Sequence, residues 1–391
     1  MISVADALTH LFDLAKPLKT EVVPLKHANG RVLAKDTVAR RDQPPFSASA
    51  MDGYAVRNAD VSPGATLTVI GESAAGHRFD GAIQPGECVR IFTGAPLPNG
   101  ADRIVIQEDV TATGTQITIG DTLDSNAYVR AKGFDFKDGE VVAAPKVLRP
   151  ADIALLAAMN IAEVTVTRRP KVAILSTGDE LVMPGETPTE DQIIASNSFG
   201  LYAMLKDIGA DPRLLPITRD TKDSLKMAFS LAQDADLLVT IGGASVGDHD
   251  LVGEVAADLG MQRSFYKIAM RPGKPLMAGR LSNGAMMIGL PGNPVSAMVC
   301  GKIFLEPVLQ ALLGLGHAPA PEFTAPLAAD VATNGPREHY MRAKLDAGQV
   351  TVFDRQDSAL LSVLAKANCL VIRPPHDPAR KAGEIMRCVA I

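Results

Sequence analysis

Residues 236–250 read DLLVTIGGASVGDHD, an apolar run that stops at a pair of glycines. A run of this length without polar alternation is typical of a strand buried on both faces of a parallel sheet. Glycines and short polar side chains follow it immediately. The stretch therefore predicts a buried strand over 236–241 whose following loop binds a ligand, because ligands of open α/β sheets lie beyond the carboxyl ends of the strands.

Strand-like and helix-like segments alternate on both sides of this stretch. The expected strands are 172–175, 214–217, 265–269 and 285–290, and the expected helices are about 198–208, 221–232, 251–259 and 295–313. Alternation of this kind predicts a doubly wound α/β domain, which we place at residues 169–317.

The residues before this domain follow another pattern. Ser3 is placed to cap a short helix whose apolar face is Val4, Leu8, Leu11 and Phe12. Short β-like runs then follow between glycine and proline turns, at 65–70, 88–92, 103–107 and 115–119. A loop at Arg149 and Pro150 leads into a further helix. We expect residues 1–168 to form an N-terminal region of one or two small β-rich lobes.

The residues after the α/β domain begin with an Ala-Pro stretch, 318–326, that predicts a linker. Strand-like runs return in residues 327–391, which predict a small C-terminal β domain. A chain of 391 residues is long enough for this multidomain organisation.

Composition excludes several classes of protein. A formal charge of −5 and a pI near 5.8 argue against a general nucleic-acid binder. The N-terminus lacks the basic start and the cleavage site of a signal peptide, so none is expected. Prolines and charged residues interrupt the most apolar region, 285–315, so no membrane-spanning helix is expected either. The cysteines lack metal-site spacing and read as reduced, buried thiols: Cys88, Cys300, Cys369 and Cys388. These features predict a cytoplasmic enzyme.

Three loops follow expected strands of the α/β domain, at 176–180, 242–250 and 291–294. Each joins glycines to hydroxyl or amide side chains, so its backbone N–H groups can face an anion. Any one of them alone could be only a tight turn, but three on one rim favour an anion site. None has Walker A or dinucleotide-binding spacing. The residues we assign to ligand binding here are Ser176, Thr177, Gly178, Gly242, Gly243, Ser245, Gly247, Pro291 and Asn293.

A basic cluster, Lys267, Arg271 and Lys274, lies beside Pro272 and Pro275, which stiffen its backbone. Arg offers a planar fork and Lys a point charge, so the cluster suits a phosphate or a tetrahedral oxyanion. A solvated run of surface charge is the alternative interpretation.

Acidic side chains fall on the same rim: Glu180, Asp220, Asp248 and Asp250. Carboxylates beside a phosphate site repel the ligand unless a hard cation such as Mg²⁺ bridges them. The combination indicates cleavage or transfer of a phosphate ester. Helix capping is the alternative for Asp220 and Asp250. His249 is the histidine nearest a candidate site, and no Ser/His/Asp or Cys/His nucleophile arrangement stands out.

In the N-terminal half, Asp52 lies among small residues in the segment 49–55. This indicates a close contact with a ligand or a second chain, and a buried structural aspartate is the alternative. The turns at 93–102 and 132–135 do not specify chemistry by themselves.

Six segments together resemble one known family in their order and approximate spacing: 49–55, 93–102, 176–181, 242–250, 271–275 and 290–296. The family is that of the molybdopterin molybdenumtransferases, the bacterial molybdenum insertases related to the C-terminal domain of gephyrin and to a plant insertase. The resemblance covers nearly the whole chain. It implies a homodimer of elongated subunits with a split, two-lobed N-terminal region, a central α/β molybdopterin-binding domain and a C-terminal β-barrel-like domain.

The resemblance also implies a reaction. Such enzymes place molybdenum from molybdate on the dithiolene of adenylylated molybdopterin and release AMP, with Mg²⁺ as the usual cation. Transient contacts with the adenylylating enzyme and with apo-molybdoenzymes are implied as well.

The family's functional residues carry over by position. The matches in the N-terminal lobes, expected to reach the partner's central domain, are Asp52, Thr93 and Asp135. The acids around the nucleotide phosphates and metal match Glu180, Asp220 and Asp250. The residues that hold molybdate match Arg271 and Lys274, with Lys267 nearby and Arg342 and Ser358 completing the pocket. The loop at the pterin end matches Pro291 and Asn293.

The chain departs from the family pattern at three positions, Ser47, Ala244 and Asp357. Asp357 adds a negative charge next to Ser358, which weakens oxyanion binding unless the carboxylate points away. This departure motivates one rival, a relative that prefers tungsten or is inactive. The other rivals are the preceding adenylylation step, which uses a similar central domain, and a scaffold, since gephyrin also clusters receptors.

Overall fold

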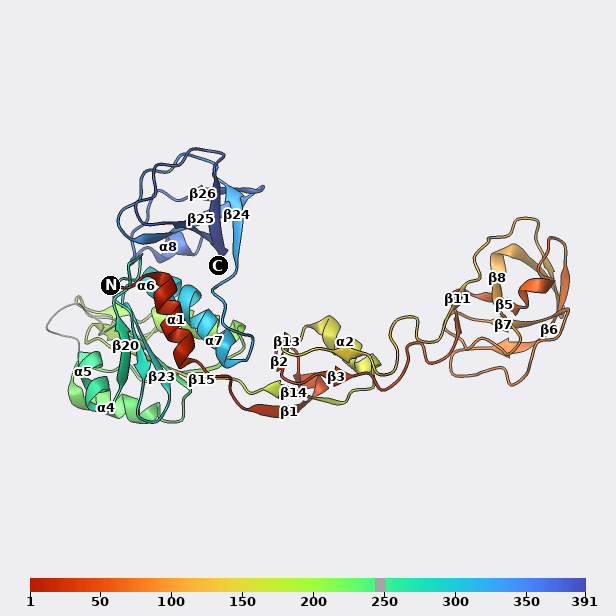
Figure 1. Ribbon diagram of the computed structural model, residues 1–391, viewed down its shortest axis with the longest axis horizontal. Helices are drawn as coiled ribbons and strands as arrows, with labels where there is room; N and C mark the ends of the chain where they lie inside the picture. Colours follow the sequence, from red (N-terminus) through yellow and green to blue (C-terminus); the bar gives the residue numbers. More distant parts are fainter. Residues whose placement is uncertain (243–250) are drawn as a thin grey trace.

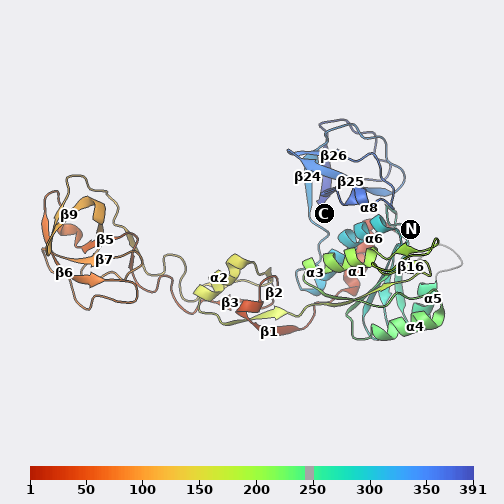
Figure 2. The same ribbon diagram turned by 180° about the vertical axis from the view of Figure 1, so that it is seen from behind.

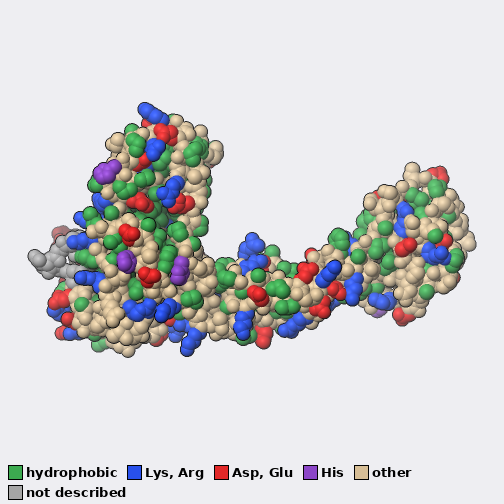
Figure 3. All heavy atoms as spheres, in the orientation of Figure 1, with side chains coloured by type: hydrophobic (Ala, Val, Ile, Leu, Met, Phe, Trp, Pro, Cys, Tyr) green, Lys and Arg blue, Asp and Glu red, His purple; other side chains and the backbone are tan. Residues whose placement is uncertain are grey.

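The structure is a computed structural model that describes residues 1–242 and 251–391. The molecule is elongated: the α/β and C-terminal domains stack at one end, and the N-terminal region extends from them as an arm of two lobes (Figures 1 and 2). On the face drawn in Figure 3, acidic and basic side chains are interspersed over the arm and over both domains.

The central sheet has six strands in the order β18-β15-β19-β23-β22-β20. The parallel strands are β18 (Asp211–Leu214), β15 (Lys171–Ser176), β19 (Leu237–Ile241) and β23 (Met286–Leu290), and the antiparallel ones are β22 (Met277–Arg280) and β20 (Gln262–Tyr266). The predicted strand over 236–241 is confirmed, with every residue of β19 buried. The strand expected at 214–217 lies three residues earlier, and it contains Pro212, which an edge strand tolerates.

Helices cover both faces of this sheet, and alternate residues of β15 point into the two resulting cores. One core contains Val172 and Ile174 with α3 (Asn197–Asp207), α6 (Pro294–Cys300) and α7 (Glu306–Leu312). The other contains Ala173 and Leu175 with α4 (Lys222–Leu231) and α5 (Leu251–Asp258). The doubly wound α/β prediction is therefore confirmed.

The helix expected at 295–313 is continuous but contains a π-helical segment, Gly301–Leu305, just before Pro307. Proline lacks the N–H of a regular helical turn, which accounts for the altered register next to it. By length and composition Pro294–Leu312 could cross a membrane, but 78% of that window is buried inside the protein, as in the core helix of a globular domain.

The first helix, α1 (Val4–Leu14), begins at Ser3, whose hydroxyl accepts from the Asp6 N–H at 3.0 Å. Its buried residues Val4, Leu8 and Leu11 belong to the core of the α/β domain, and Phe12 stacks half-buried on His317. The sequence grouped this helix with the N-terminal lobes. An amphipathic pattern reveals the apolar face of a helix but not which core receives it.

The lobe nearer the α/β domain, which we call the middle lobe, is built from two separate stretches of chain. Its sheet has the order β1-β14-β2-β13, and helix α2 (Pro150–Ala158) packs beside it. The strands are β1 (Thr20–Pro24), β2 (Val32–Leu33), β13 (Lys146–Val147) and β14 (Glu163–Thr167), with a further pair β3 (Thr37–Val38) and β12 (Val141–Val142).

The far lobe, which we call the distal lobe, contains the residues between those two stretches. Its six-stranded sheet has the order β8-β5-β7-β6-β10-β9. The strands are β5 (Gly53–Val56), β6 (Thr66–Ser73), β7 (Glu87–Ile91), β8 (Arg103–Ile106), β9 (Val110–Thr113) and β10 (Gln116–Ile119), with the pair β4 (Ala48–Ser49) and β11 (Val129–Arg130). The N-terminal region therefore contains two β-rich lobes, within the predicted one or two.

The C-terminal domain is a β domain, as predicted, but the predicted linker is wrong from residue 322. Glu322–Pro326 forms strand β24, which pairs over five residues with β28 (Ile385–Ala390). The other elements are β25 (Glu338–Asp346), β26 (Gln349–Val352), β27 (Cys369–Arg373) and the short helix α8 (Leu361–Leu364). Prolines at 321 and 326 suggested a linker, yet one lies just before the strand and the other ends it, at the edge of the sheet.

Strand β21 (Met270–Arg271) joins the two domains, because it leaves the α/β domain and pairs in parallel with β25 of the C-terminal sheet. Met270 lies opposite Glu338, and Arg271 lies opposite His339. The C-terminal domain is therefore held to the α/β domain by backbone pairing as well as by side-chain packing.

Replacing Leu11 by alanine tests the placement of α1. Leu11 is fully buried in the α/β core, so Leu11→Ala is expected to lower the stability of that domain by about 2–4 kcal/mol. Hydrogen exchange of amides in β19 and β23 measures the loss, with Thr9→Ala on the exposed face of the helix as the control. Faster exchange only in the N-terminal lobes would contradict this placement.

Candidate functional site

A cavity of about 850 Å³ opens at the carboxyl ends of β15, β19 and β23. Its lining comes from loops of the α/β domain and from residues 356–359 of the C-terminal domain. Two domains therefore form one site, at the edge of the sheet where the strand pattern predicted it.

The three predicted loops meet at this edge. Ser176 ends β15 and is followed by Thr177 and Gly178; Gly242 follows β19, and Pro291 to Asn293 follow β23. All of them line the cavity. The Thr177 N–H donates to Ile241 O at 3.0 Å, and the Gly242 N–H donates to Leu290 O at 3.2 Å. Gly242 has φ +87°, and a Cβ there would lie 2.7 Å from Thr177 O, so only glycine fits. The predicted residues Gly243, Ser245, Gly247 and Asp250 lie outside the described residues.

Two predicted acids, Glu180 and Asp220, line the same cavity. Partial desolvation at the edge of the cavity raises the pKa of the Asp220 carboxyl, and the charges of Asp179 and Glu180 raise it further. The Glu180 carboxylate folds over Gly178, where a Cβ would lie 2.5 Å from Oε2. Within residues 1–242 and 251–391, no cluster of three His, Cys, Asp or Glu side chains is arranged to hold a metal. Glu180 and Asp220 still concentrate negative charge at one edge of the cavity.

Arg271 and Lys274 line the cavity from the segment that follows β20. Their loop is tight: the Ile268 N–H donates to Lys274 O at 3.0 Å. Gly273 has φ +113°, and a Cβ there would lie 2.5 Å from Cys300 Sγ. Lys267 is not among the lining residues. It has φ +81°, a sparsely populated conformation for a residue with a side chain, and its ammonium lies 5.3 Å from the Tyr266 ring centroid.

The C-terminal wall of the cavity is held by hydrogen bonds to the α/β domain. Asn293 Nδ2 donates to Ser358 Oγ at 3.0 Å, and the Val295 N–H donates to Ser358 O at 3.0 Å. Asp357 also lines the cavity, and its carboxylate accepts from the Ala359 N–H at 2.8 Å. The negative charge of Asp357 is therefore partly engaged by its own turn.

Arg342 lies behind this wall rather than in the cavity lining, and it is fully buried. One terminal nitrogen, Nη2, donates to Asp357 O at 2.9 Å, whereas Nε and Nη1 have no partner within the described residues. Burial, followed by the charge of Arg271, lowers the pKa of Arg342 to about 10, although Asp357 acts in the opposite direction. A buried guanidinium with free N–H groups is poised to attract an anion.

The sequence did not single out several residues of this site. Arg337 lines the cavity and donates from Nη1 to Met270 O at 3.2 Å. His339 is buried one strand away from Arg271. Leu181, Ile193 and Ile194 give the cavity an apolar wall from β16 (Leu181–Val182) and β17 (Ile193–Ile194).

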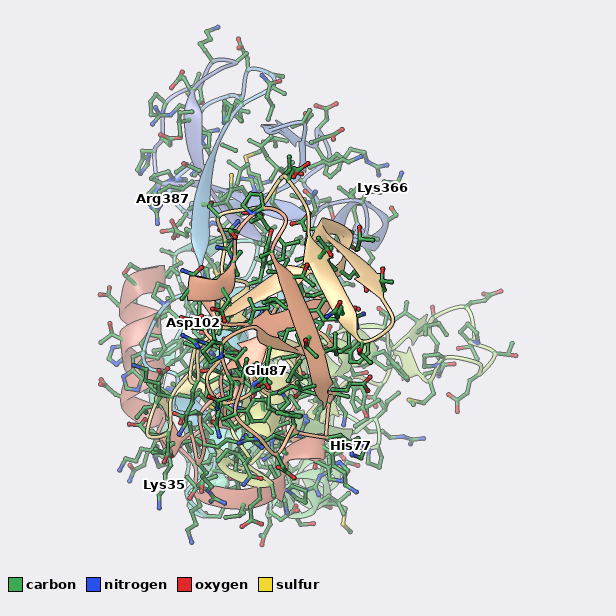
Figure 4. The ribbon with its side chains drawn as sticks, turned by 90° about the vertical axis from the view of Figure 1, so that its right-hand side faces the viewer. Lys35, His77, Glu87, Asp102, Lys366 and Arg387 are labelled. Carbon is green, nitrogen blue, oxygen red and sulfur yellow. The ribbon has the colours of Figure 1, made fainter. Side chains whose placement is uncertain are left out.

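The predicted residues of the N-terminal lobes lie elsewhere. Asp52 Oδ1 accepts from the Thr93 N–H at 2.7 Å and from Thr93 Oγ1 at 2.8 Å, and these bonds lower the pKa of Asp52. Asp52 is half-buried, and Asp135 is exposed near the junction of the two lobes. Figure 4 views the molecule from the free end of the arm, with Glu87 and Asp102 of the distal lobe in front of the domains that form the cavity. The whole middle lobe thus separates Asp52 and Thr93 from the cavity of the same chain (Figure 1).

Comparison with known families covers almost the entire chain. Residues 2–160 match the MoeA N-terminal region (domain I and II), residues 173–311 match a probable molybdopterin binding domain, and residues 324–388 match the MoeA C-terminal region (domain IV).

Individual relatives agree with this result. A molybdopterin molybdenumtransferase from Nostoc sp. is 38% identical, covering 98% of this chain and 92% of the relative, and one from Haemophilus influenzae is 36% identical, covering 98% and 97%. The crystal structure of a molybdopterin biosynthesis MoeA protein from Pyrococcus horikosii matches with a TM-score of 0.83 and 30% identity, over 100% of this chain and 99% of the other. The chain belongs to the molybdopterin molybdenumtransferase (MoeA) family of molybdenum cofactor biosynthesis.

Proposed function

We propose that this protein inserts molybdenum from molybdate into adenylylated molybdopterin and releases AMP. The observation that carries the proposal is one cavity in which glycine-rich loops, carboxylates and a basic wall from two domains converge. The full-length relatives named molybdopterin molybdenumtransferase support the same reaction.

Different walls of the cavity carry different charges, and we assign each part of the substrates to the wall that suits it. Arg271, Lys274 and Ser358 hold the molybdate oxygens, since two cationic groups and a hydroxyl suit a tetrahedral dianion. The backbone N–H groups of the loops after β15 and β19 bind the pyrophosphate. The loop from Pro291 to Asn293 meets the pterin end. Because Ser358 comes from the C-terminal domain, the cavity favours insertion over the preceding adenylylation, which does not need that domain.

Mg²⁺ fits the acidic edge of the cavity. Partial desolvation and then the charges of Asp179 and Glu180 raise the pKa of Asp220, and a cation would offset both effects. Glu180 and Asp220 would hold it, together with Asp250 of the predicted set. Bound there, Mg²⁺ would offset the charge of the pyrophosphate during its hydrolysis.

We also propose a homodimer in which the arm of one subunit supplies Asp52, Thr93 and Asp135 to the cavity of the other. Support comes from the separation of Asp52 and Thr93 from their own cavity along the arm (Figure 2). The middle lobe also leaves apolar side chains exposed on four short strands, available for contact with a second chain: Val22, Val38, Val141 and Val147.

A cytoplasmic location agrees with the four cysteines, which are free and buried. We also propose transient contacts with two kinds of protein. The adenylylating enzyme supplies the substrate, and the apo-molybdoenzymes receive the product.

An assay of AMP release tests the reaction. Wild-type protein with adenylylated molybdopterin, Mg²⁺ and molybdate is expected to release AMP only when molybdate is present. Asp52→Ala is expected to lower the rate about 100-fold or more, because Asp52 positions the reacting groups. Asp80→Ala, an exposed position in the same lobe, is the matched control. Release of AMP without molybdate, or none under any metal condition, would contradict the insertase function.

Mixed dimers test the shared site. Asp52→Ala and Glu180→Ala proteins are each expected to be inactive, whereas an equal mixture of the two, dissociated and reassembled, should recover about a quarter of wild-type activity. Half of the dimers then carry one site with both residues intact. If the mixture stays inactive, the two residues act in the same chain and the domain-exchanged site is wrong.

Asp220→Asn tests the cation site. The folded-state pKa of Asp220 is raised, so its carboxylate destabilises the folded protein above pH 3.8, and removing the charge should stabilise the cation-free protein at neutral pH. The gain should not exceed about 1 kcal/mol, because Asp220 is exposed and solvent screens its charge. Thermal unfolding with and without Mg²⁺ should show a smaller Mg²⁺-induced rise in Tm than in the wild type or in Asp121→Asn. An unchanged Mg²⁺ response would remove Asp220 from the site.

A further inference from the structure

One arginine of the distal lobe lies between two of the residues that the arm is proposed to supply. Arg90 of β7 lies directly opposite Tyr54 of β5, so the two side chains share one face of the sheet. Asp52 immediately precedes β5, and Thr93 lies two residues after the end of β7. Arg90 is therefore near both chain segments whose ends carry Asp52 and Thr93.

The guanidinium of Arg90 holds the backbone next to Asp52. Its Nη1 donates to Gly53 O at 3.0 Å, and its Nη2 donates to Gln107 Oε1 at 2.7 Å. The Gln107 N–H in turn donates to Asp52 O at 3.1 Å. Because these bonds fix the carbonyl groups of Asp52 and of Gly53, the direction of the Asp52 side chain is set by the neighbouring strands as well as by its own.

The same guanidinium lies over two aromatic rings. Its central carbon, Cζ, lies 5.1 Å from the ring centroid of Tyr54 and 4.9 Å from that of Phe92. Contacts of this kind are attractive, so they hold the arginine against both rings. Phe92 directly precedes Thr93, and this packing therefore supports the end of β7 from which the Thr93 N–H and hydroxyl reach Asp52.

Arg90 differs in this respect from Arg57, which follows the opposite end of β5. Arg57 pairs with Asp60 at 3.9 Å, three residues further along its own segment. The contacts of Arg90 instead converge on the residues beside Asp52 and Thr93. The hydrogen bonds from Thr93 lower the pKa of Asp52, and the positive charge of Arg90 adds to their effect.

We propose that Arg90 is a positioning residue of the reaction, which holds the Asp52 carboxylate and the Thr93 hydroxyl in the arrangement that the arm presents to the cavity of the second subunit. This inference rests on the proposed function and on the proposed homodimer. Arg90 acts through Asp52 and Thr93 rather than on the substrate, so its loss should slow the reaction without weakening substrate binding. Displacement of a reacting group by about 1 Å can cost about 100-fold in rate, so a partial loss of this support is measurable.

Steady-state AMP release by the full-length protein tests this role. Arg90→Met keeps an aliphatic stem but removes the charge and the donors, so kcat is expected to fall about tenfold while KM for adenylylated molybdopterin stays within about twofold. Arg90→Lys keeps the charge but not the planar fork, so it should recover part of the loss. Arg57→Met, at the other end of β5, is the matched control and should behave as wild type.

A double-mutant cycle identifies the residue through which Arg90 acts. In single turnovers with enzyme in excess, the Asp52→Ala, Arg90→Met double variant should react at the rate of Asp52→Ala alone, because no carboxylate is left to position. A further tenfold or so loss in the double variant would show that Arg90 acts independently of Asp52 and would overturn the proposal. An unchanged kcat in Arg90→Met, or a change confined to KM, would overturn it as well.

Hydrogen exchange separates a local effect from a general loss of stability, and it needs no activity. In Arg90→Met the amides of Thr93 and Gln107 should exchange about tenfold faster or more, whereas those of β6 and β10 should not change. Exchange that is unchanged at Thr93, or equally faster throughout the distal lobe, contradicts the positioning role.

Two further outcomes are distinguishable. If Arg90→Met does not fold, Gln107→Ala takes its place, because it removes the acceptor of Arg90 Nη2 at an exposed position, and it must show a smaller loss of the same kind. If wild type releases no AMP, the proposed function is contradicted instead. Exchange at Thr93 then decides whether Arg90 holds the pair formed by Asp52 and Thr93.

Discussion

The backbone pairing of β21 with β25 is the contact on which the site depends. The Glu338 N–H donates to Ala269 O at 3.0 Å, and the register places Arg271 opposite His339. A two-residue strand of the α/β domain thereby becomes the edge of the C-terminal sheet. The basic loop on one side and the turn that carries Ser358 on the other are consequently held at a constant separation. The hydrogen bonds from Asn293 and Val295 to Ser358 strengthen the same arrangement.

Charge is distributed so that one cavity can hold both ends of a phosphorylated pterin and an oxyanion. Carboxylates follow β15 and precede α4, whereas Arg271 and Lys274 come from β21 and its following loop. The arm carries a third set of groups, centred on the Asp52 carboxylate that Thr93 holds in its ionised form. In the homodimer that we propose, the elongated subunit would present this set to the cavity of a second copy.

The parts predicted correctly from the sequence depend on local patterns. β19 is apolar throughout because helices cover both faces of its sheet, and Ser3 and Asp6 together specify the start of α1. The loops after β15, β19 and β23 were predictable because parallel strands bring their carboxyl ends to one edge. Asp357 illustrates the limit of such patterns: its charge is visible in the sequence, but its bond to the Ala359 N–H is not.

The parts that were missed depend on contacts between distant segments. No local feature shows that α1 packs on the α/β domain, or that Glu322–Pro326 continues the C-terminal sheet instead of linking two domains. His339 gained its surroundings only through pairing with Arg271, 68 positions earlier in the chain, and with Arg373. The apolar wall from Ile193 and Ile194 likewise arises where a long excursion of chain returns to the cavity.

The most direct test of this account is the position of a bound oxyanion. Crystals of the protein soaked in tungstate, a heavier analogue of molybdate, give an anomalous-difference map in which the metal is located without a prior assumption. The strongest peak is expected inside the cavity, beside Arg271, Lys274 and Ser358. A cavity without a peak in tungstate-saturated crystals, or a stronger peak on another surface, would contradict the assignment of this wall to the metal oxyanion.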